Sequence, residues 1–183
     1  ILPEPDAWFR QVEAVSGVRV ARTAWQEARR SALDMASLLK RLNARADLAA
    51  SPLVIAEAPG SDATALRREQ ADRKAAGLDA PWMTAAAASS AVGTATGGAI
   101  RLRDGFRYDP VRATIALTKA AADAGARVFE KSAVKRTRFT RKTADVVTAT
   151  GSIRTRGIYI ATGRPGPVFR QLERHVTVRQ GFA

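Results

Sequence analysis

The sequence predicts a mixed fold, α/β with an α+β part, and three observations carry this prediction. An apolar run that starts at Gly157 ends in Ala161-Thr162-Gly163 and has the composition of a buried parallel strand. Asp109-Pro110 starts a helix that precedes a short strand, which is the order found in parallel sheets. Closely spaced strands between residues 133 and 156 predict an antiparallel meander inserted between two strands of that sheet.

The first half alternates helices with short strands. Trp25, Leu38 and Leu42 belong to a set of apolar residues that recur every three or four positions, which predicts a long helix. Gly17 and Gly77 have the position of helix stops. The expected elements are a helix over 4–16, a strand over 18–20, a helix over 23–46, a strand over 53–56, a polar helix from Ser61 or Asp62 to Ala76, and a strand over 99–102. Residues 84–98 leave a short helix and a loop both open.

The second half has clearer start and stop signals. Asp109 has the place of an N-cap, Pro110 that of the first helical residue, and Gly125 that of a C-terminal stop. Val111, Ile115, Thr118 and Ala122 share one face of this helix. The expected elements are a helix over 110–124 and strands over 127–130, 133–140, 143–150 and 152–156, the last of which continues to 161.

Composition excludes several classes of protein. The chain has no cysteine, which excludes disulfide scaffolds and thiolate metal sites and fits a cytoplasmic location. No stretch approaches the roughly 20 apolar residues of a membrane span. Because the chain begins at Ile1 without Met and stops at Ala183 in a loop-like stretch, we expect it to be a fragment of a longer polypeptide.

Positive charge is concentrated in the second half. Residues 110–183 hold 15 Lys and Arg against 4 Asp and Glu, a net charge of +11, and seven of these bases lie between Arg127 and Lys142. Such a cluster attracts polyanions, so a nucleic-acid-binding module is one hypothesis. We favour a solvated hairpin, because only Phe129 and Phe139 interrupt the basic stretch and single-strand binders interleave more aromatic residues.

Few residues qualify as candidates for chemistry. His175 is the only histidine, so neither a histidine metal cluster nor a Ser-His-Asp set is available, and we expect it on the surface. Gly93 to Gly98 lacks the spacing of a dinucleotide fingerprint. Gly163 remains: without a Cβ it would let a cofactor chain pass close to the backbone at the end of a strand, the alternative being a simple turn.

Four motifs, in this order and spacing, resemble the middle of FAD-dependent amine and amino-acid oxidoreductases, the superfamily of D-amino-acid oxidase, glycine oxidase and sarcosine oxidase. They are Gly105–Arg112, Ala124–Val134, Thr150–Ile153 and Tyr159–Gly163. Upstream, Leu66–Leu78 and Gly98–Ile100 are similar to the cap of the same family. The resemblance implies part of a substrate cap over 1–104. Over 105–183 it implies part of a Rossmann-like FAD-binding domain with a β-meander.

The resemblance also implies a cofactor, FAD, and residues that contact it. The peptide at Val134 would face the adenine through backbone hydrogen bonds, and Ala161, Thr162 and Gly163 would pass near the diphosphate. The implied reaction is hydride transfer from a small amine or amino acid to the flavin. No catalytic residue and no metal ligand is nominated. Because the strand and glycine-rich turn that hold the diphosphate are missing, we expect the chain alone not to retain FAD. A non-catalytic structural subunit with a flavin fold is a further alternative.

Overall fold

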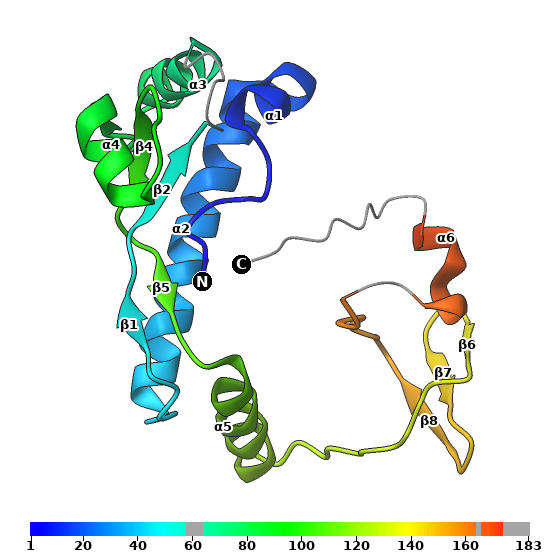
Figure 1. Cartoon of the computed structure of the whole chain (residues 1–183). Coiled ribbons are helices and arrows are strands. Elements are labelled where there is room, and N and C mark those ends of the chain that lie inside the picture. The colour runs from blue at the N-terminus through cyan, green and yellow to red at the C-terminus, as the bar shows by residue number, and fades with distance from the viewer. Residues whose placement is uncertain (58–63, 164–165, 174–183) are drawn as a thin grey trace. The chain divides into compact units, whose positions relative to one another are not determined.

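The computed structural model describes residues 1–57, 64–163 and 166–173, and the chain divides into two compact units (Figure 1). The first unit is Ile1–Ala126 and the second is Arg127–Ala183. No helix among the described residues is long and apolar enough to cross a membrane.

The first unit contains five helices and five short strands within its described residues. The helices are α1 (Phe9–Ser16), α2 (Val18–Arg41), α3 (Thr64–Ala75), α4 (Ala85–Val92) and α5 (Pro110–Asp123). The strands are β1 (Ala49–Ala50), β2 (Leu53–Ala56), β3 (Trp82–Met83), β4 (Ala99–Leu102) and β5 (Phe106–Arg107).

The first unit contains a three-stranded antiparallel sheet in the order β2-β4-β3, and β1 and β5 form a separate antiparallel pair. Ile100 on the central strand is fully buried, and it lies opposite Ile55 on one side and Trp82 on the other. Leu66 of α3 is also fully buried and packs in the same cluster as Ile100 and Leu102. The sheet therefore buries one apolar cluster against α3.

Two further apolar clusters hold the helices of this unit together. Phe9 of α1 is fully buried, and its ring meets the Trp25 ring of α2 edge-on at 5.3 Å between centroids. Complete burial of a Phe side chain contributes about 2–3 kcal/mol. Leu39 of α2 packs with Ala113 of α5, and Leu117 packs against the same cluster. Both clusters use α2, which explains why this helix is long.

The predicted start of α5 is confirmed. The Asp109 carboxylate accepts hydrogen bonds from the backbone N–H groups of Val111 (2.9 Å) and Arg112 (3.0 Å), with Pro110 as the first helical residue. The face that packs in this unit is that of Ala113 and Leu117, whereas Val111 is 65% exposed.

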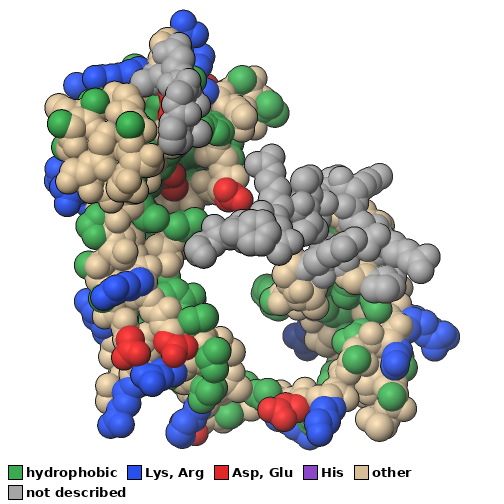
Figure 2. All heavy atoms as spheres, in the orientation of Figure 1, with side chains coloured by type: hydrophobic (Ala, Val, Ile, Leu, Met, Phe, Trp, Pro, Cys, Tyr) green, Lys and Arg blue, Asp and Glu red, His purple; other side chains and the backbone are tan. Residues whose placement is uncertain are grey.

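The second unit contains the predicted meander. Its elements are β6 (Arg136–Phe139), β7 (Ala144–Val147), β8 (Ser152–Thr155), the 3-10 turn η1 (Pro167–Phe169) and α6 (Arg170–Glu173). The three strands form an antiparallel sheet in the order β6-β7-β8. Several Lys and Arg side chains lie on the part of this unit that Figure 2 shows, among apolar and other side chains.

The predicted parallel sheet is wrong for the described part of the chain, where every strand pairing is antiparallel. Residues 127–130 and 157–161 form no strand, and Tyr159 is fully exposed. The physical reason is that neither segment has a neighbouring strand among the described residues. An apolar composition favours a strand, but a strand forms only when a partner pairs its backbone.

Residues 18–20 are helical, so the brief strand predicted there is also wrong. Val18 starts α2 directly after Gly17, because the helical period already extends through Ala21 to Trp25 and both are buried. Packing of that face overrides the β preference of Val18 and Val20.

Several predicted boundaries shift. Helix α1 begins at Phe9 rather than residue 4, and α2 ends at Arg41, where three residues with positive φ follow: Asn43, Arg45 and Asp47. Residues 84–98 contain α4, whose N-cap Thr84 accepts a hydrogen bond from the Ala87 N–H. The predicted caps Ser61 and Asp62 lie outside the described residues.

Gly98→Ala tests the packing of the central sheet. Gly98 has φ of +145°, and a Cβ there would lie 2.2 Å from the Trp82 ring. This ring packs against the Leu66 cluster, and the Arg67 guanidinium lies over it at 3.7 Å. We expect Gly98→Ala to lower the free energy of unfolding by about 3 kcal/mol through overpacking and backbone strain. Gly93→Ala is the control: it has φ of +76° but open space around the added carbon, so the cost is about 1 kcal/mol. Urea denaturation followed by circular dichroism measures both, and equal losses would contradict the packing.

Candidate functional site

The residues that the sequence predicts to contact a cofactor lie in the second unit. Val134 lies just before β6 and is 39% exposed, and its backbone makes no hydrogen bond within the described residues. Ala161, Thr162 and Gly163 follow β8 and are exposed. Gly163 has φ of +71°, with open space where a Cβ would stand.

These residues fit a backbone contact to a cofactor. The peptide group at Val134 makes no hydrogen bond to another described residue and could bond to a ligand, and the left-handed Gly163 leaves its backbone accessible to an approaching chain. The charged side chains that are buried among the described residues, Glu69 and Arg73, both belong to the first unit and not to this segment.

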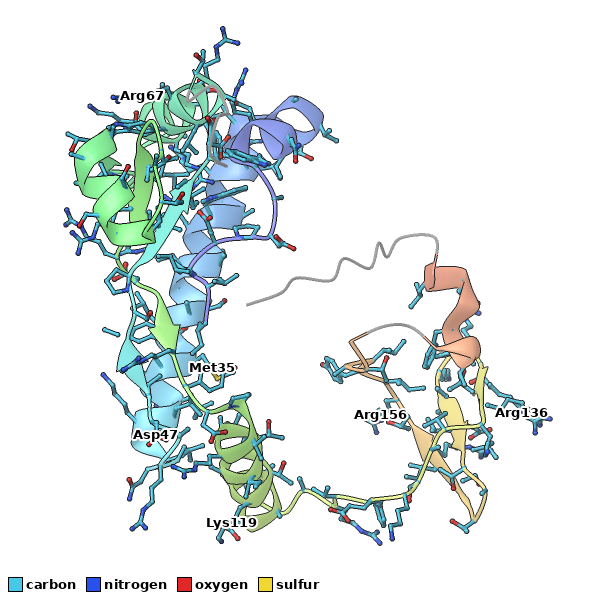
Figure 3. The ribbon with its side chains drawn as sticks, in the orientation of Figure 1. Met35, Asp47, Arg67, Lys119, Arg136 and Arg156 are labelled. Atoms are coloured by element: carbon cyan, nitrogen blue, oxygen red, sulfur yellow. The ribbon has the colours of Figure 1, made fainter. Side chains whose placement is uncertain are left out.

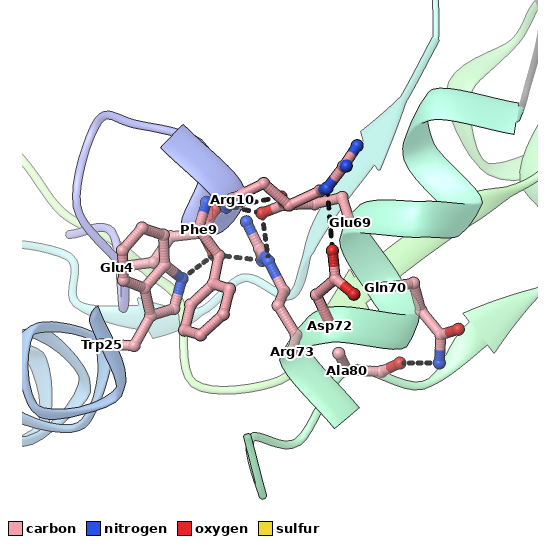
Figure 4. Close-up of polar contacts among 9 residues, drawn as sticks. All are labelled: Glu4, Phe9, Arg10, Trp25, Glu69, Gln70, Asp72, Arg73 and Ala80. Carbon is pink, nitrogen blue, oxygen red and sulfur yellow. Dashed lines mark hydrogen bonds and ion pairs between the residues drawn. The ribbon is translucent and has the colours of Figure 1, made fainter. Parts of the chain in front are cut away.

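The sequence interpretation missed a cluster of buried charge in the first unit (Figure 4). Arg73 of α3 donates from Nε to Glu69 Oε1 (2.7 Å) and from Nη1 to Glu4 Oε2 (2.6 Å). Glu69 is 0% exposed and Arg73 is 2% exposed. The Arg73 guanidinium also lies 5.5 Å from the centre of the Trp25 ring, and the Trp25 indole N–H donates to Glu4 Oε2 (3.3 Å).

Glu69 caps a helix that does not cap itself. Trp8 occupies the N-cap position of α1 and offers no oxygen in its side chain. Instead, the Glu69 carboxylate accepts from the backbone N–H groups of Phe9 (2.7 Å) and Arg10 (3.1 Å). A carboxylate at a helix N-terminus satisfies unpaired donors and meets the positive end of the helix dipole. This carboxylate comes from another helix, so it also ties α1 to α3.

Glu4 extends the cluster to the segment before α1. Burial raises the pKa of the Glu4 carboxyl above its ordinary value of 4.5, while the charge and the hydrogen bond of Arg73 offset part of the rise. A cavity of about 250 Å³ opens beside these residues, lined among others by Glu4, Arg29, Arg73 and Asp104. Arg29 and Asp104, which both line it, form an ion pair at 2.5 Å.

This cavity contains paired acids and bases but no nucleophile with an adjacent base, so it nominates no catalytic residue. Within the described ranges, no group of three or more His, Asp or Glu side chains is placed to hold a metal ion. His175 lies outside the described residues. The sequence shows only that Glu69 and Arg73 can pair, because they are four residues apart on the helical face that also carries Leu66; the spacing does not indicate their burial.

Comparison with known proteins places the chain in a family. A family model described as FAD dependent oxidoreductase matches residues 7–182. The chain belongs to this family. The cofactor of this family is FAD, which confirms the cofactor that the sequence resemblance implied.

Solved structures show the corresponding fold. Glycine oxidase from Geobacillus kaustophilus is 24% identical with a TM-score of 0.60, covering 73% of this chain and 38% of its own. L-Proline dehydrogenase from P. horikoshii is 18% identical with a TM-score of 0.55, covering 70% of this chain and 36% of its own. The chain thus spans little more than a third of the solved structures it matches. The comparison with curated proteins gives no significant match.

Glu69→Gln tests whether the buried Glu69 carboxylate stabilises the N-terminus of α1. The substitution leaves Arg73 buried with one charged partner fewer and weakens the cap of α1, so we expect it to lower the free energy of unfolding by about 3 kcal/mol. Asp72→Asn is the control on the same helix, because the Asp72–Arg10 pair (2.8 Å) is exposed and contributes less than about 1 kcal/mol. Urea denaturation compares the two. Similar losses for both variants would show that the buried cap is not special.

Glu4→Gln tests the effect of burial on the Glu4 carboxyl. Because the folded state holds this proton more tightly than the unfolded chain does, the contribution of Glu4 is fully present below pH 4.5 and is lost as the pH rises through the raised pKa. The free energy of unfolding of the wild type minus that of Glu4→Gln should therefore decrease as the pH rises from 4 to 7. Urea denaturation across this range measures it, and a difference that grows with pH would refute the burial.

Proposed function

We propose that the chain is part of an FAD-dependent oxidoreductase that oxidises a small amine or amino acid. The observation that carries the proposal is the family match, which extends over residues 7–182. The names of the two solved structures support the substrate class, because one acts on glycine and the other on L-proline. When bound, FAD supplies the acceptor for the hydride that leaves the substrate.

Within this proposal, two segments of the second unit contact the cofactor through their backbones. Val134 bonds the adenine through its peptide groups, which make no hydrogen bond within the described residues. Ala161, Thr162 and Gly163 lie along the diphosphate, and the left-handed backbone of Gly163 lets it approach closely. Both contacts depend on backbone atoms, so the side chains at these positions need only leave room.

The proposed domains are a partial substrate cap over 1–104 and a partial FAD-binding domain over 105–183. In support, the small antiparallel sheet β2-β4-β3 lies entirely before residue 104, and the meander lies entirely after residue 105. Helix α5 packs on α2 through Ala113 and Leu39, so it contributes to the compact first unit while belonging, in this proposal, to the cofactor domain.

Gly163→Val, introduced into the full-length protein, tests the proposal. Valine at a positive φ is strained and places a branched side chain where the cofactor would pass, so we expect the bound FAD to fall at least about tenfold. Gly157→Ala is the control, because Gly157 lies in the same loop and, unlike Gly163, does not have a positive φ. Flavin absorbance near about 450 nm per protein measures the content. A wild-type protein without flavin would overturn the proposed function, whereas equal flavin in both variants would overturn only the role of Gly163.

A further inference from the structure

The meander separates its side chains onto two faces. Because side chains alternate along a strand, the paired register places one row of residues on each face. Phe139, Val146 and Ile153 lie on the first face together with Thr137. The opposite face, called here the basic face, carries Arg136, Arg138, Asp145, Val147, Ser152 and Arg154.

The basic face has three guanidinium groups and one carboxylate. Asp145 lies on the central strand between Arg138 and Arg154. Arg154 donates to both Asp145 oxygens, from Nε at 2.8 Å and from Nη2 at 3.4 Å. Arg136 and Arg138 make no ion pair with any described residue, and Figure 3 shows Arg136 extending away from the sheet. The face therefore keeps uncompensated positive charge.

A hollow gives this charge a defined location. It has a volume of about 340 Å³ and is lined by Arg138, Asp145, Val147, Ser152 and Arg154. That volume is at the lower end of the range for small-molecule sites. The aromatic Phe139 lies on the other face, so bases of a single-stranded nucleic acid would have no ring to stack on here.

We propose that the basic face binds a small anion that carries a diphosphate group. Arg138 and the free donors of Arg154 present planar forks on both sides of Asp145, and such forks match phosphate oxygens in pairs. The Ser152 hydroxyl on the same face is an additional donor. Residues 127–183 hold 13 Lys and Arg against 3 Asp and Glu, so the wider field also favours a multiply charged anion.

Asp145 sets the affinity of this site. Hydrogen bonding to Arg154 lowers the pKa of the Asp145 carboxyl, so the carboxylate stays charged at neutral pH and competes with the ligand for Arg154. Removing this carboxylate should strengthen anion binding, and removing either arginine should weaken it. A surface that attracted anions only through its net charge would not respond to position in this way.

The test is calorimetric titration of the full chain with inorganic pyrophosphate at low salt, with ADP as a second probe. We expect Arg138→Gln to weaken pyrophosphate binding about tenfold, the effect of losing a charge-assisted pair of hydrogen bonds, and Asp145→Asn to strengthen it about fivefold. Arg138 makes no ion pair with the described residues, so its substitution should leave the fold intact, which circular dichroism verifies.

Arg141→Gln and Lys142→Gln are matched controls, because they remove the same charge at the exposed β6–β7 turn. We expect each to change binding less than about twofold. Equal losses at the turn and at Arg138, or no pyrophosphate binding at low salt, would overturn the proposal. Binding of DNA that pyrophosphate does not displace would overturn it as well. Tighter binding of ADP than of pyrophosphate would support it with a nucleotide as the source of the diphosphate. Pyrophosphate binding is measured without reference to flavin content, so this test can fail while the proposed function holds, and the reverse.

Discussion

The first unit depends on a buried carboxylate that caps a helix to which it does not belong. Glu69 accepts two backbone N–H groups at the start of α1 and one guanidinium from its own helix. Three polar partners are thereby removed from water together. Such a group adds little net stability compared with an apolar core, but it is costly to leave half-paired. Its consequence is specificity, because α1 cannot rotate or slide on α3 without stranding a buried charge.

The same cluster fixes the segment that precedes α1. Arg73 binds Glu69 on one side and Glu4 on the other, so the order of contacts runs from α3 through Arg73 to the N-terminal segment. Trp25 closes the cluster with its ring beside the guanidinium and its indole N–H on Glu4. Apolar packing between Phe9 and Trp25 and polar pairing at Arg73 therefore support one another, and the cavity beside Glu4 has a fixed wall.

The sequence predicted those elements whose signals are local. Asp109-Pro110 specifies the start of α5 by capping, and this start was found. The strand predicted over 99–102 was found as well, although Ala99, Ile100 and Leu102 are all buried in it and only Arg101 is exposed. The meander was found as well, because strands that are joined by short connections usually pair with each other. The run at 157–161 shows the opposite case: its composition is that of a strand, but pairing requires a neighbour that the described residues do not contain.

Buried charge was the part of the first unit that the sequence did not reveal. Helix α3 has so many charged residues that its pattern predicts an exposed helix, yet Glu69 and Arg73 are among the most buried side chains described. Their partners, Glu4 and the Phe9 N–H, lie about 60 or more positions away along the chain. A hydrophobicity pattern reports the affinity of a side chain for water, and it contains no information about a partner that removes the need for water.

The second unit has two proposed binding regions, and one uses backbone atoms whereas the other uses side chains. The proposed cofactor contacts at Val134 and Gly163 use backbone atoms, so motif order and glycine placement are sufficient to suggest them from sequence. The basic face uses side chains from all three strands. In the sequence its Arg138 and Arg154 are 16 positions apart, and only the register of β6, β7 and β8 brings them to the two sides of Asp145. A linear run of bases predicts attraction to anions in general, whereas the sheet turns part of that charge into a place where one anion of defined size can bind.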